Sequence, residues 1–209
     1  MNAIETHALT RRFGAHTAVD GLDLTVRQGE LFALLGVNGA GKTTTLRMLS
    51  GLLQPTGGEA DILGFRLTQQ PQEIKRRINL SPQETAVAPN LTVRENLELI
   101  AGIYGASWRE TIAEFHLGEV ERSRAKTLSG GWQRRLSIAM ALISQPQLVF
   151  LDEPTLGLDV LARRELWQVI RSLRGRVTVI LTTHYLEEAE ALSDRIGILS
   201  HGRLRICGT

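Results

Sequence analysis

Residues 36–43 read Gly36-Val-Asn-Gly-Ala-Gly-Lys-Thr43, and this stretch decides the fold. It matches G-x-x-x-x-G-K-[ST] at every fixed position. The short apolar run Leu31–Leu35 comes before it and predicts a buried strand, and a helical stretch from Lys42 to about Leu52 follows. A phosphate-binding loop requires this strand–loop–helix setting. The match therefore favours a phosphate loop over the alternative, a glycine-rich turn that happens to contain a lysine.

Each residue type in this loop has a task in phosphate binding. Glycine leaves room for backbone N–H groups to converge on phosphate oxygens, and the N-terminus of the following helix adds partial positive charge. Lys42 is a point cation for the terminal phosphates, and the Thr43 hydroxyl can bind Mg²⁺. We expect ATP and Mg²⁺ as ligands, with ATP contacting Gly36, Asn38, Gly39, Ala40, Gly41, Lys42, Thr43 and Thr44.

A pair of acids ends a second apolar run. Residues 148–153 read Leu148-Val-Phe-Leu-Asp-Glu153, which predicts a buried strand followed by two carboxylates. Consecutive strand residues point to opposite sides, so the two acids can act separately. We expect Asp152 to reach Mg²⁺ and Glu153 to orient or deprotonate the attacking water. Two solvated acids at a strand end are the alternative, but beside a phosphate loop the pair predicts nucleotide hydrolysis.

The rest of the chain predicts an α/β fold around these motifs. Residues 4–26 alternate apolar and polar residues, with turn signals at Arg12–Gly14 and Asp20–Gly21, which is typical of antiparallel strands. From Leu148 onward, strands and helices alternate, which predicts a mostly parallel core sheet. We therefore expect a P-loop NTPase core with an N-terminal antiparallel β subdomain, formed by residues 1–83 and 146–209. An α-helical subdomain of residues 84–145 would be inserted into it, within a single domain of residues 1–209.

The middle of the chain carries helix start and stop signals. Thr92-Val-Arg-Glu95 and Ser107-Trp-Arg-Glu110 both have the pattern of a capping box, in which the first side chain and the fourth satisfy each other's backbone N–H groups. Gly105 is suited to end the first of these helices. The sequence therefore predicts two helices here, ahead of a third that follows Gly131.

Composition narrows the classes of protein. A formal net charge of +2 is too small to favour binding to nucleic acid or to an anionic membrane surface. The basic pairs Arg134–Arg135 and Arg163–Arg164 lie in predicted helices, where a solvated helix face is the expected explanation. Cys207 is the only cysteine, which fits a reducing compartment. No run approaches the ~20 apolar residues that cross a bilayer, so we expect a cytoplasmic protein.

The order of the motifs resembles that of the ABC ATPase family over nearly the whole chain. The phosphate loop is followed by Gln83, Leu128-Ser-Gly-Gly131, the strand with its acidic pair, Asp159 and His184. The resemblance implies that two such domains pair head to tail, each closing its segment Leu128–Gly131 over ATP held by the other. Ser129, Gly130 and Gly131 would then bind the partner's ATP, although Ser129 alone is also an ordinary helix N-cap.

The resemblance also implies roles for single residues. Gln83 resembles the glutamine that contacts Mg²⁺ and water and links ATP to the helical subdomain. Asp159 resembles the residue that joins the two sites of the dimer. His184 resembles the switch histidine at the γ-phosphate, where an ordinary strand-end histidine is the alternative. Phe13 occupies the adenine-stacking position, where a core residue is the alternative. The expected catalytic residues are Glu153, His184, Gln83 and Lys42, and the expected Mg²⁺ ligands are Thr43, Gln83 and Asp152.

Two features depart from the family pattern. Trp132 follows Leu128–Gly131 where glutamine is usual, which bears on dimer packing and on the start of the following helix. The segment Ser107–Arg124 is shorter than is typical, and it lies in the part that would contact a membrane partner. Both departures concern coupling to a partner rather than ATP chemistry.

The phrases Glu153–Asp159 and His184–Glu190 most resemble ATPases of the ABC-2 export type. The resemblance implies an ATP-binding subunit that powers transport, in the direction of export, by a separate integral membrane permease. Through this permease the subunit would lie peripherally on the inner face of the cell membrane. The expected partners are a second copy of the chain and the permease, without nucleic acid. A soluble ABC ATPase that acts on ribosomes or DNA is the alternative, but such proteins usually carry two cassettes or long insertions. A regulator without hydrolysis would be expected to lack Glu153 or Lys42.

Overall fold

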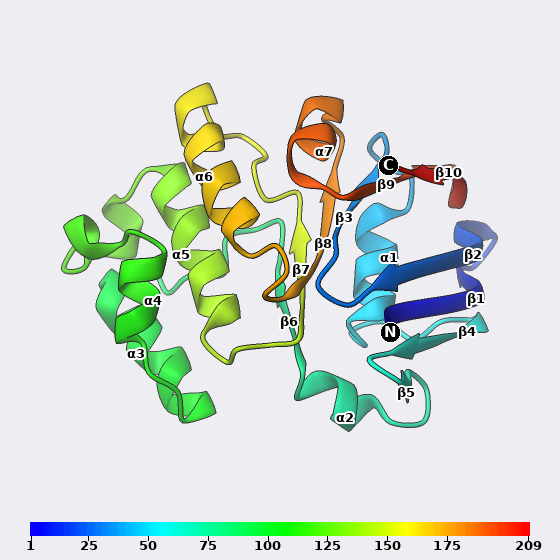
Figure 1. The fold of residues 1–209 in the computed structure, drawn as a ribbon, viewed down its shortest axis with the longest axis horizontal. Coiled ribbons are helices and arrows are strands. Elements are labelled where there is room, and N and C mark those ends of the chain that lie inside the picture. Colours follow the sequence, from blue (N-terminus) through cyan, green and yellow to red (C-terminus); the bar gives the residue numbers. More distant parts are fainter.

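The computed structural model describes residues 1–209, and its strands form two sheets (Figure 1). The strands are β1 (Asn2–Phe13), β2 (His16–Arg27), β3 (Leu31–Leu35), β4 (Gly57–Ile62), β5 (Phe65–Arg66), β6 (Ile78–Ser81), β7 (Leu148–Asp152), β8 (Thr178–Thr183), β9 (Arg195–Ser200) and β10 (Arg203–Gly208). The α-helices are α1 (Lys42–Leu49), α2 (Pro71–Lys75), α3 (Val93–Tyr104), α4 (Arg109–Glu114), α5 (Gly130–Leu142), α6 (Val160–Ser172) and α7 (Leu186–Leu192). Short 3-10 helices, η1 (Gly118–Val120) and η2 (Ala125–Thr127), precede α5.

The larger sheet has six strands in the order β10-β9-β3-β8-β7-β6. Its strands pair in parallel except at one edge, where β10 is antiparallel to β9. The mostly parallel core sheet predicted from the sequence is therefore confirmed. Because parallel strands end at the same edge of a sheet, the loops that follow β3, β6, β7 and β8 meet there, and this edge is where ligands bind in such sheets.

The smaller sheet, β2-β1-β4-β5, is antiparallel, as predicted for the N-terminal part of the chain. β1 and β2 pair from Asn2 opposite Arg27 to Phe13 opposite His16, so the chain turns at Gly14. The prediction of a second turn at Asp20–Gly21 is wrong, because β2 runs through these residues. Gly21 has a φ of 60° where the register between the strands shifts, so it accommodates an irregularity inside the strand.

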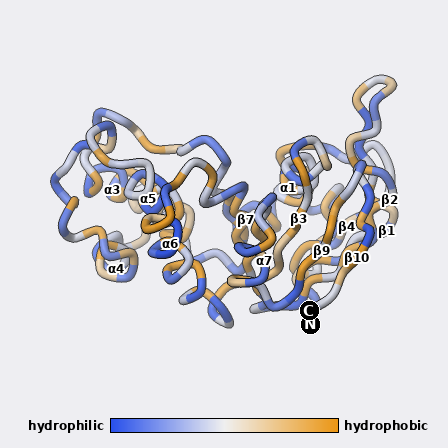
Figure 2. Tube along the Cα trace, turned by 90° about the horizontal axis from the view of Figure 1, so that it is seen from above, coloured by the Kyte–Doolittle hydropathy of each residue, from blue (hydrophilic) through white to orange (hydrophobic).

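The core sheet is covered on both faces, because alternate residues of its strands enter two hydrophobic clusters. Leu31 and Ala33 of β3 enter a cluster built with α3, α5, α6 and α7, whereas Phe32 and Leu34 enter the other. This second cluster contains apolar residues of α1, β1, β2 and β4, so α1 lies between the two sheets (Figure 1). In Figure 2 the hydrophobic segments follow the interior strands, and many of the connecting loops are hydrophilic.

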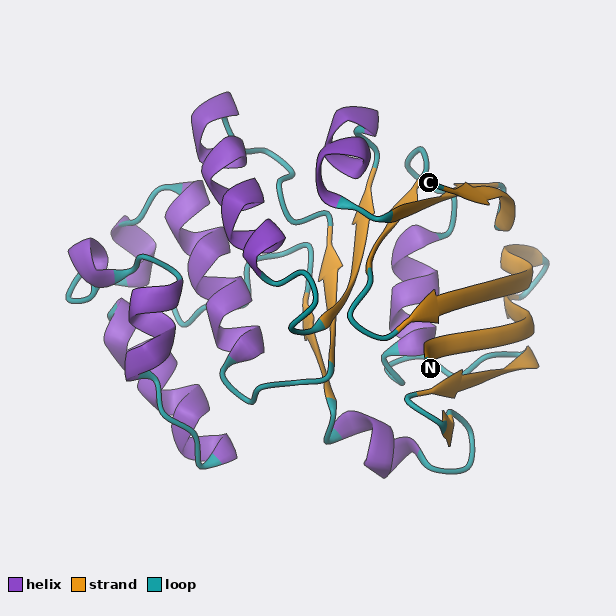
Figure 3. Ribbon diagram, viewed as in Figure 1, coloured by secondary structure: helices purple, strands orange, loops and turns teal.

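Helices α3 to α6 gather on the side of the core sheet away from the antiparallel sheet (Figure 3). α3 begins with the predicted capping box, in which Glu95 N donates to Thr92 Oγ1 at 3.1 Å and Thr92 N donates to Glu95 Oε2 at 2.7 Å. Gly105, with a φ of 65°, ends this helix as predicted. The box predicted at Ser107–Glu110 is wrong, because α4 begins only at Arg109 and its N-cap residue, Trp108, makes no capping hydrogen bond.

Several elements lie where the sequence patterns predicted none. β6 and β10 are the edge strands of the core sheet; β6 has only four residues, which is too short for periodicity to indicate it, whereas the alternation of Arg203-Leu-Arg-Ile206 in β10 was overlooked. The subdomain boundaries at residues 84 and 145 stay a prediction, since α5 packs in the same hydrophobic cluster as the core strands. None of the helices combines the length and the apolar character that crossing a bilayer would require.

Candidate active site

The phosphate loop occupies the connection between β3 and α1, and its glycines are held by close packing. A Cβ on Gly36 would lie 2.5 Å from the carbonyl oxygen of Leu199, and a Cβ on Gly41 would lie 2.4 Å from that of Ala18. Gly41 also has a φ of 103°, which side chains rarely allow. Only glycine therefore suits either end of the loop, and α1 begins directly after it, with Gly41 as the N-cap residue.

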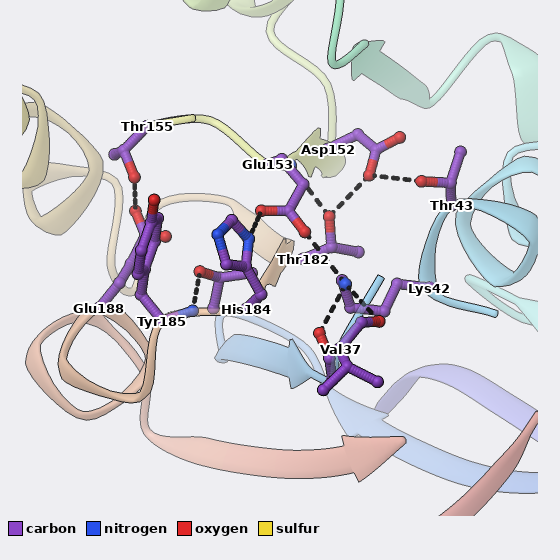
Figure 4. A network of polar contacts seen from close by, with 12 residues as sticks. Val37, Lys42, Thr43, Asp152, Glu153, Thr155, Thr182, His184, Tyr185 and Glu188 are labelled. Atoms are coloured by element: carbon purple, nitrogen blue, oxygen red, sulfur yellow. Dashed lines mark hydrogen bonds and ion pairs between the residues drawn. The ribbon is translucent and has the colours of Figure 1, made fainter. Parts of the chain in front are cut away.

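Lys42 is the first residue of α1, and its ammonium group folds back over the loop. Its Nζ donates to the carbonyl oxygens of Gly36 at 2.6 Å and Val37 at 3.2 Å, and lies 3.1 Å from Glu153 Oε1 (Figure 4). The side chain is almost fully buried, and a buried cation interacts strongly with nearby anions. The ammonium is thus fixed at the mouth of the loop, where a terminal phosphate would bind.

Asp152 ends β7 and faces α1. Its Oδ1 accepts hydrogen bonds from Thr43 Oγ1 at 3.1 Å and from Thr182 Oγ1 at 2.7 Å (Figure 4). Thr43, Gln83 and Asp152 also line one hollow beside the phosphate loop. This donor set suits Mg²⁺, which binds proteins through few oxygen ligands and takes the rest from phosphate and water.

Glu153 follows Asp152 and turns the other way. Its Oε1 lies 3.1 Å from Lys42 Nζ, and its Oε2 lies 2.8 Å from His184 Nδ1. Its backbone has a φ of 47°, an uncommon value for a residue other than glycine, and Glu153 N donates to Thr182 Oγ1 at 2.9 Å. The strained turn directs the carboxylate away from Asp152 and into the space between Lys42 and His184. His184 therefore lies at the site, which its interpretation as a switch histidine requires and its interpretation as an ordinary strand-end histidine does not.

A cavity of about 440 Å³ opens above these groups, a size typical of small-molecule sites. Phe13 lies at its rim with 46% of its surface exposed, so the alternative that Phe13 is a core residue is wrong. Gly36 and Ala40 do not line the cavity, because they pack beneath the loop. The residues that line it are Phe13, His16, Ala18, Asn38, Gly39, Gly41, Lys42, Thr43, Thr44, Gln83, Glu153 and Leu156.

Gln83 reaches this cavity from the loop after β6. The loop is held from behind by Arg134 of α5, which donates to the carbonyl oxygens of Pro82, at 2.6 Å, and of Gln83. The prediction that Arg134–Arg135 forms a solvated helix face is therefore wrong, since these residues are only 5% and 8% exposed. Arg135 is buried because it pairs with Glu165 at 2.8 Å and covers the ring of Trp132.

Ser129, Gly130 and Gly131 do not line the cavity of their own chain. They form the start of α5, where Ser129 and Gly130 are exposed and Gly131 is half-buried, and Ser129 Oγ accepts from Trp132 N at 3.5 Å. The effect of Trp132 on dimer packing and on the start of the helix stays a prediction. Asp159 caps α6 by accepting from Leu161 N at 2.9 Å and Ala162 N at 3.0 Å. The start of α5 and the loop that leads into α6 lie side by side, since a Cβ on Gly130 would lie 3.6 Å from Leu158 Cδ2.

Sequence patterns missed several residues that organise the site. Thr182 joins the backbone of Glu153 to the carboxylate of Asp152. Glu188, 1% exposed, accepts from Thr155 Oγ1 at 2.8 Å, which ties α7 to the loop after Glu153 (Figure 4). It also accepts from Trp167 Nε1 at 3.2 Å, which ties α7 to α6. The only sequence signal for either residue is a polar side chain in an apolar strand or on the inner face of a helix.

The family model described as ABC transporter matches residues 19–156, a range that holds the phosphate loop, Gln83, the segment Leu128–Gly131 and the acidic pair. This chain belongs to the ABC transporter family. The ABC domain is 46% identical to the daunorubicin/doxorubicin resistance ATP-binding protein DrrA of Streptomyces peucetius, over 99% of the chain and 65% of that protein. It is 41% identical to the probable multidrug ABC transporter ATP-binding protein YbhF of Escherichia coli, over 99% of the chain and 37% of that protein. The chain thus spans less than two thirds of these relatives.

Solved structures agree with this assignment. An ATP-binding subunit of an ABC transporter superposes with a TM-score of 0.86 at 32% identity, covering 99% of this chain and 90% of that one. A dimeric ATP-binding cassette in a post-hydrolysis state, bound to ADP and Pi, superposes with a TM-score of 0.85 at 26% identity, covering 99% and 98%. The predicted fold class is therefore confirmed.

Proposed function

We propose that this ABC domain hydrolyses ATP to ADP and phosphate, and that it does so in a head-to-tail dimer that drives a membrane permease. The observation that carries the proposal is the position of Glu153, whose carboxylate lies between Lys42 of the phosphate loop and His184. A base beside a fixed cation is what attack of water on a terminal phosphate requires.

Each group at the site has a proposed part in the reaction. Glu153 accepts a proton from the attacking water. The water oxygen then bonds to the γ-phosphorus, and the bond between this phosphorus and the β–γ bridging oxygen breaks, which releases ADP. Lys42 stabilises the charge on the phosphate oxygens, and His184 holds the carboxylate of Glu153 in place, 2.8 Å away. Thr43, Asp152 and Gln83 would hold Mg²⁺, which neutralises charge on the phosphates. Phe13 would stack on adenine.

The dimer is proposed from the exposed segment Leu128–Gly131. A helix N-terminus with Ser129 and two glycines is suited to phosphate, yet these residues do not line the cavity of their own chain. We infer that they close over ATP bound to a second copy, with Asp159 joining the two sites. The dimeric state named for a similar cassette supports this arrangement.

The membrane partner is proposed from the relatives. Those named above are ATP-binding proteins of drug resistance and of a probable multidrug transporter. We infer that this domain likewise sits on the cytoplasmic face of a membrane through a permease, and that transport is export. Co-purification with a candidate permease, followed by a search for compounds that stimulate ATP turnover, would test this partner.

Hydrolysis is tested by Glu153→Gln, which keeps the shape of the side chain and removes its basicity. We expect kcat to fall about 100-fold or more, in line with the ~10²–10⁴ contributed by general bases. Glu190→Gln, an exposed change in α7, is the matched control. Equal turnover by wild type and Glu153→Gln would refute the role of Glu153.

A further inference from the structure

Arg134 is a buried cation with no carboxylate partner. It lies in the second turn of α5 and is 5% exposed, yet it takes part in none of the ion pairs of the chain. Its guanidinium instead donates through Nη1 to Pro82 O at 2.6 Å and through Nη2 to Gln83 O. Two successive backbone carbonyls of the Gln83 loop are therefore held by one side chain.

This arrangement is unfavourable for Arg134 taken alone. Burial lowers the pKa of its guanidinium, and the nearby charge of Asp152 opposes this shift only in part. The favourable contribution comes from two charge-assisted hydrogen bonds, which are stronger than neutral ones and which the planar fork of arginine makes in a fixed geometry. A neutral side chain would be easier to bury, so the cation is best explained by what it holds in place.

A second contact joins the same face of α5 to the same segment. Ser137, one turn after Arg134, has its hydroxyl oxygen 3.1 Å from that of Ser81 in a buried hydrogen bond. Residues three apart in a helix lie on one face. α5 thus contacts residues 81, 82 and 83 in succession, and the Gln83 loop follows the position of this helix.

The two ends of this connection belong to two different nucleotide sites. Gln83 lines the cavity of its own chain together with Lys42, Thr43 and Glu153. The N-terminus of α5, one turn from Arg134, carries Ser129–Gly131, which do not line that cavity. We propose that Arg134 is a positioning residue that fixes Gln83 to α5, so that engagement of Ser129–Gly131 with a partner's ATP sets the position of Gln83 in the chain's own site. This inference rests on the proposed function.

Arg134→Met tests the connection, because methionine has similar length but no donor. We expect faster hydrogen–deuterium exchange in the peptide spanning residues 82–86, whose loop loses its anchor. We also expect kcat to fall about tenfold while the Kd for ATP changes less than about twofold, since Arg134 does not line the ATP cavity. Arg134→Lys keeps the charge and a donor but lacks the planar fork that reaches two carbonyl groups, so both properties should lie between those of wild type and Arg134→Met.

Arg135→Met is the matched control for exchange. Arg135 is also buried in α5 but pairs with Glu165, so its loss should leave exchange in residues 82–86 unchanged. A Gln83→Ala background tests the route of the effect: there, Arg134→Met should lower kcat no further, as expected for two residues that act as one unit.

Three results would overturn the inference: unchanged exchange and kcat in both Arg134 variants, equal exchange in the Arg135 control, or an undiminished effect of Arg134→Met in the Gln83→Ala background. If Arg134→Met does not fold, Arg134→Lys takes its place: exchange in residues 82–86 and kcat that both equal those of wild type would overturn the inference. Absence of ATP turnover in the wild-type chain would refute the proposed function instead, while exchange would still report whether Arg134 fixes the loop.

Discussion

Phe13 and Arg11 illustrate how single residues build the nucleotide site. The guanidinium of Arg11 lies 4.5 Å from the centroid of the Phe13 ring and is anchored by donation to Gln54 O at 2.8 Å. Arg11 does not line the cavity, whereas Phe13 does. The ring is therefore held by a cation on the side away from the cavity, which leaves its other face for a base.

Removal of Arg11 should weaken ATP binding without slowing hydrolysis. A cation–π contact at an exposed site contributes ~0.5–1 kcal/mol, so Arg11→Ala should raise the Kd for ATP about two- to fivefold. Titration of ATP against intrinsic fluorescence measures this change. The neighbouring exposed Arg12 gives the control Arg12→Ala, and an effect of Arg11→Ala that persists in a Phe13→Ala background would contradict the explanation.

Glu188 predicts a pH dependence of stability. Burial raises its pKa above the ordinary 4.5, and its hydrogen bonds from Thr155 and Trp167 offset this only in part, with the charge of Glu153 raising it further. A raised pKa in the folded state means that the stabilising contribution is complete below the unfolded value and is lost as pH rises through the folded one. Glu188→Gln removes this loss, so the variant should gain stability relative to wild type as pH rises from about 4.5.

Urea denaturation between acid and neutral pH measures this difference. Glu190→Gln, on the exposed side of the same helix, is the matched control. A difference between Glu188→Gln and wild type that does not change with pH would show that the carboxyl does not titrate as inferred.

At the scale of elements, α5 and α6 approach each other so closely that Gly131 has a packing role. A Cβ on Gly131 would lie 2.9 Å from the Cβ of Ala162, whereas one on Gly130 would meet only Leu158 Cδ2 at 3.6 Å. The first distance requires the helices to move apart, and the second is an ordinary contact. The two adjacent glycines therefore differ in what they do for the fold.

This difference is measurable as stability. We expect Gly131→Ala to lower the free energy of unfolding by about 1–3 kcal/mol, as overpacked sites do. Gly130→Ala should leave it unchanged or raise it by up to about 1 kcal/mol, because alanine favours helix. Denaturant midpoints of the two variants decide this, and equal destabilisation by both would contradict the packing explanation.

Patterns among residues close in sequence predicted the elements that have a clear run of apolar residues, a phosphate-loop motif or a helix-capping motif. The phosphate loop, the strand that ends in Asp152, and the capping box of α3 all depend on neighbours in sequence, and all lie where predicted. The burial of Arg134 could not be predicted in this way, because it depends on carbonyl groups some 50 residues away in sequence, at Pro82 and Gln83. Short edge strands such as β6 likewise acquire their structure only from pairing with β7.

At the scale of the whole molecule, the proposed dimer would join two parts of the chain into one site. The cavity with Lys42, Thr43 and Glu153 lies at the end of the core sheet, and Ser129–Gly131 lie outside it at the start of α5, with Ser129 and Gly130 exposed. The central claim is therefore that two copies of the chain complete each other's site when ATP is bound.

The mass of the Glu153→Gln variant in Mg²⁺ and ATP, measured by gel filtration with light scattering, tests this claim most directly. Slowed hydrolysis should hold ATP between the copies, and the account predicts a mass twice the 23.1 kDa of one chain. Without ATP, or with Ser129→Arg added to block the segment that closes on the partner, the mass should return to that of one chain. A variant that binds ATP and remains a monomer at all protein concentrations would contradict the account.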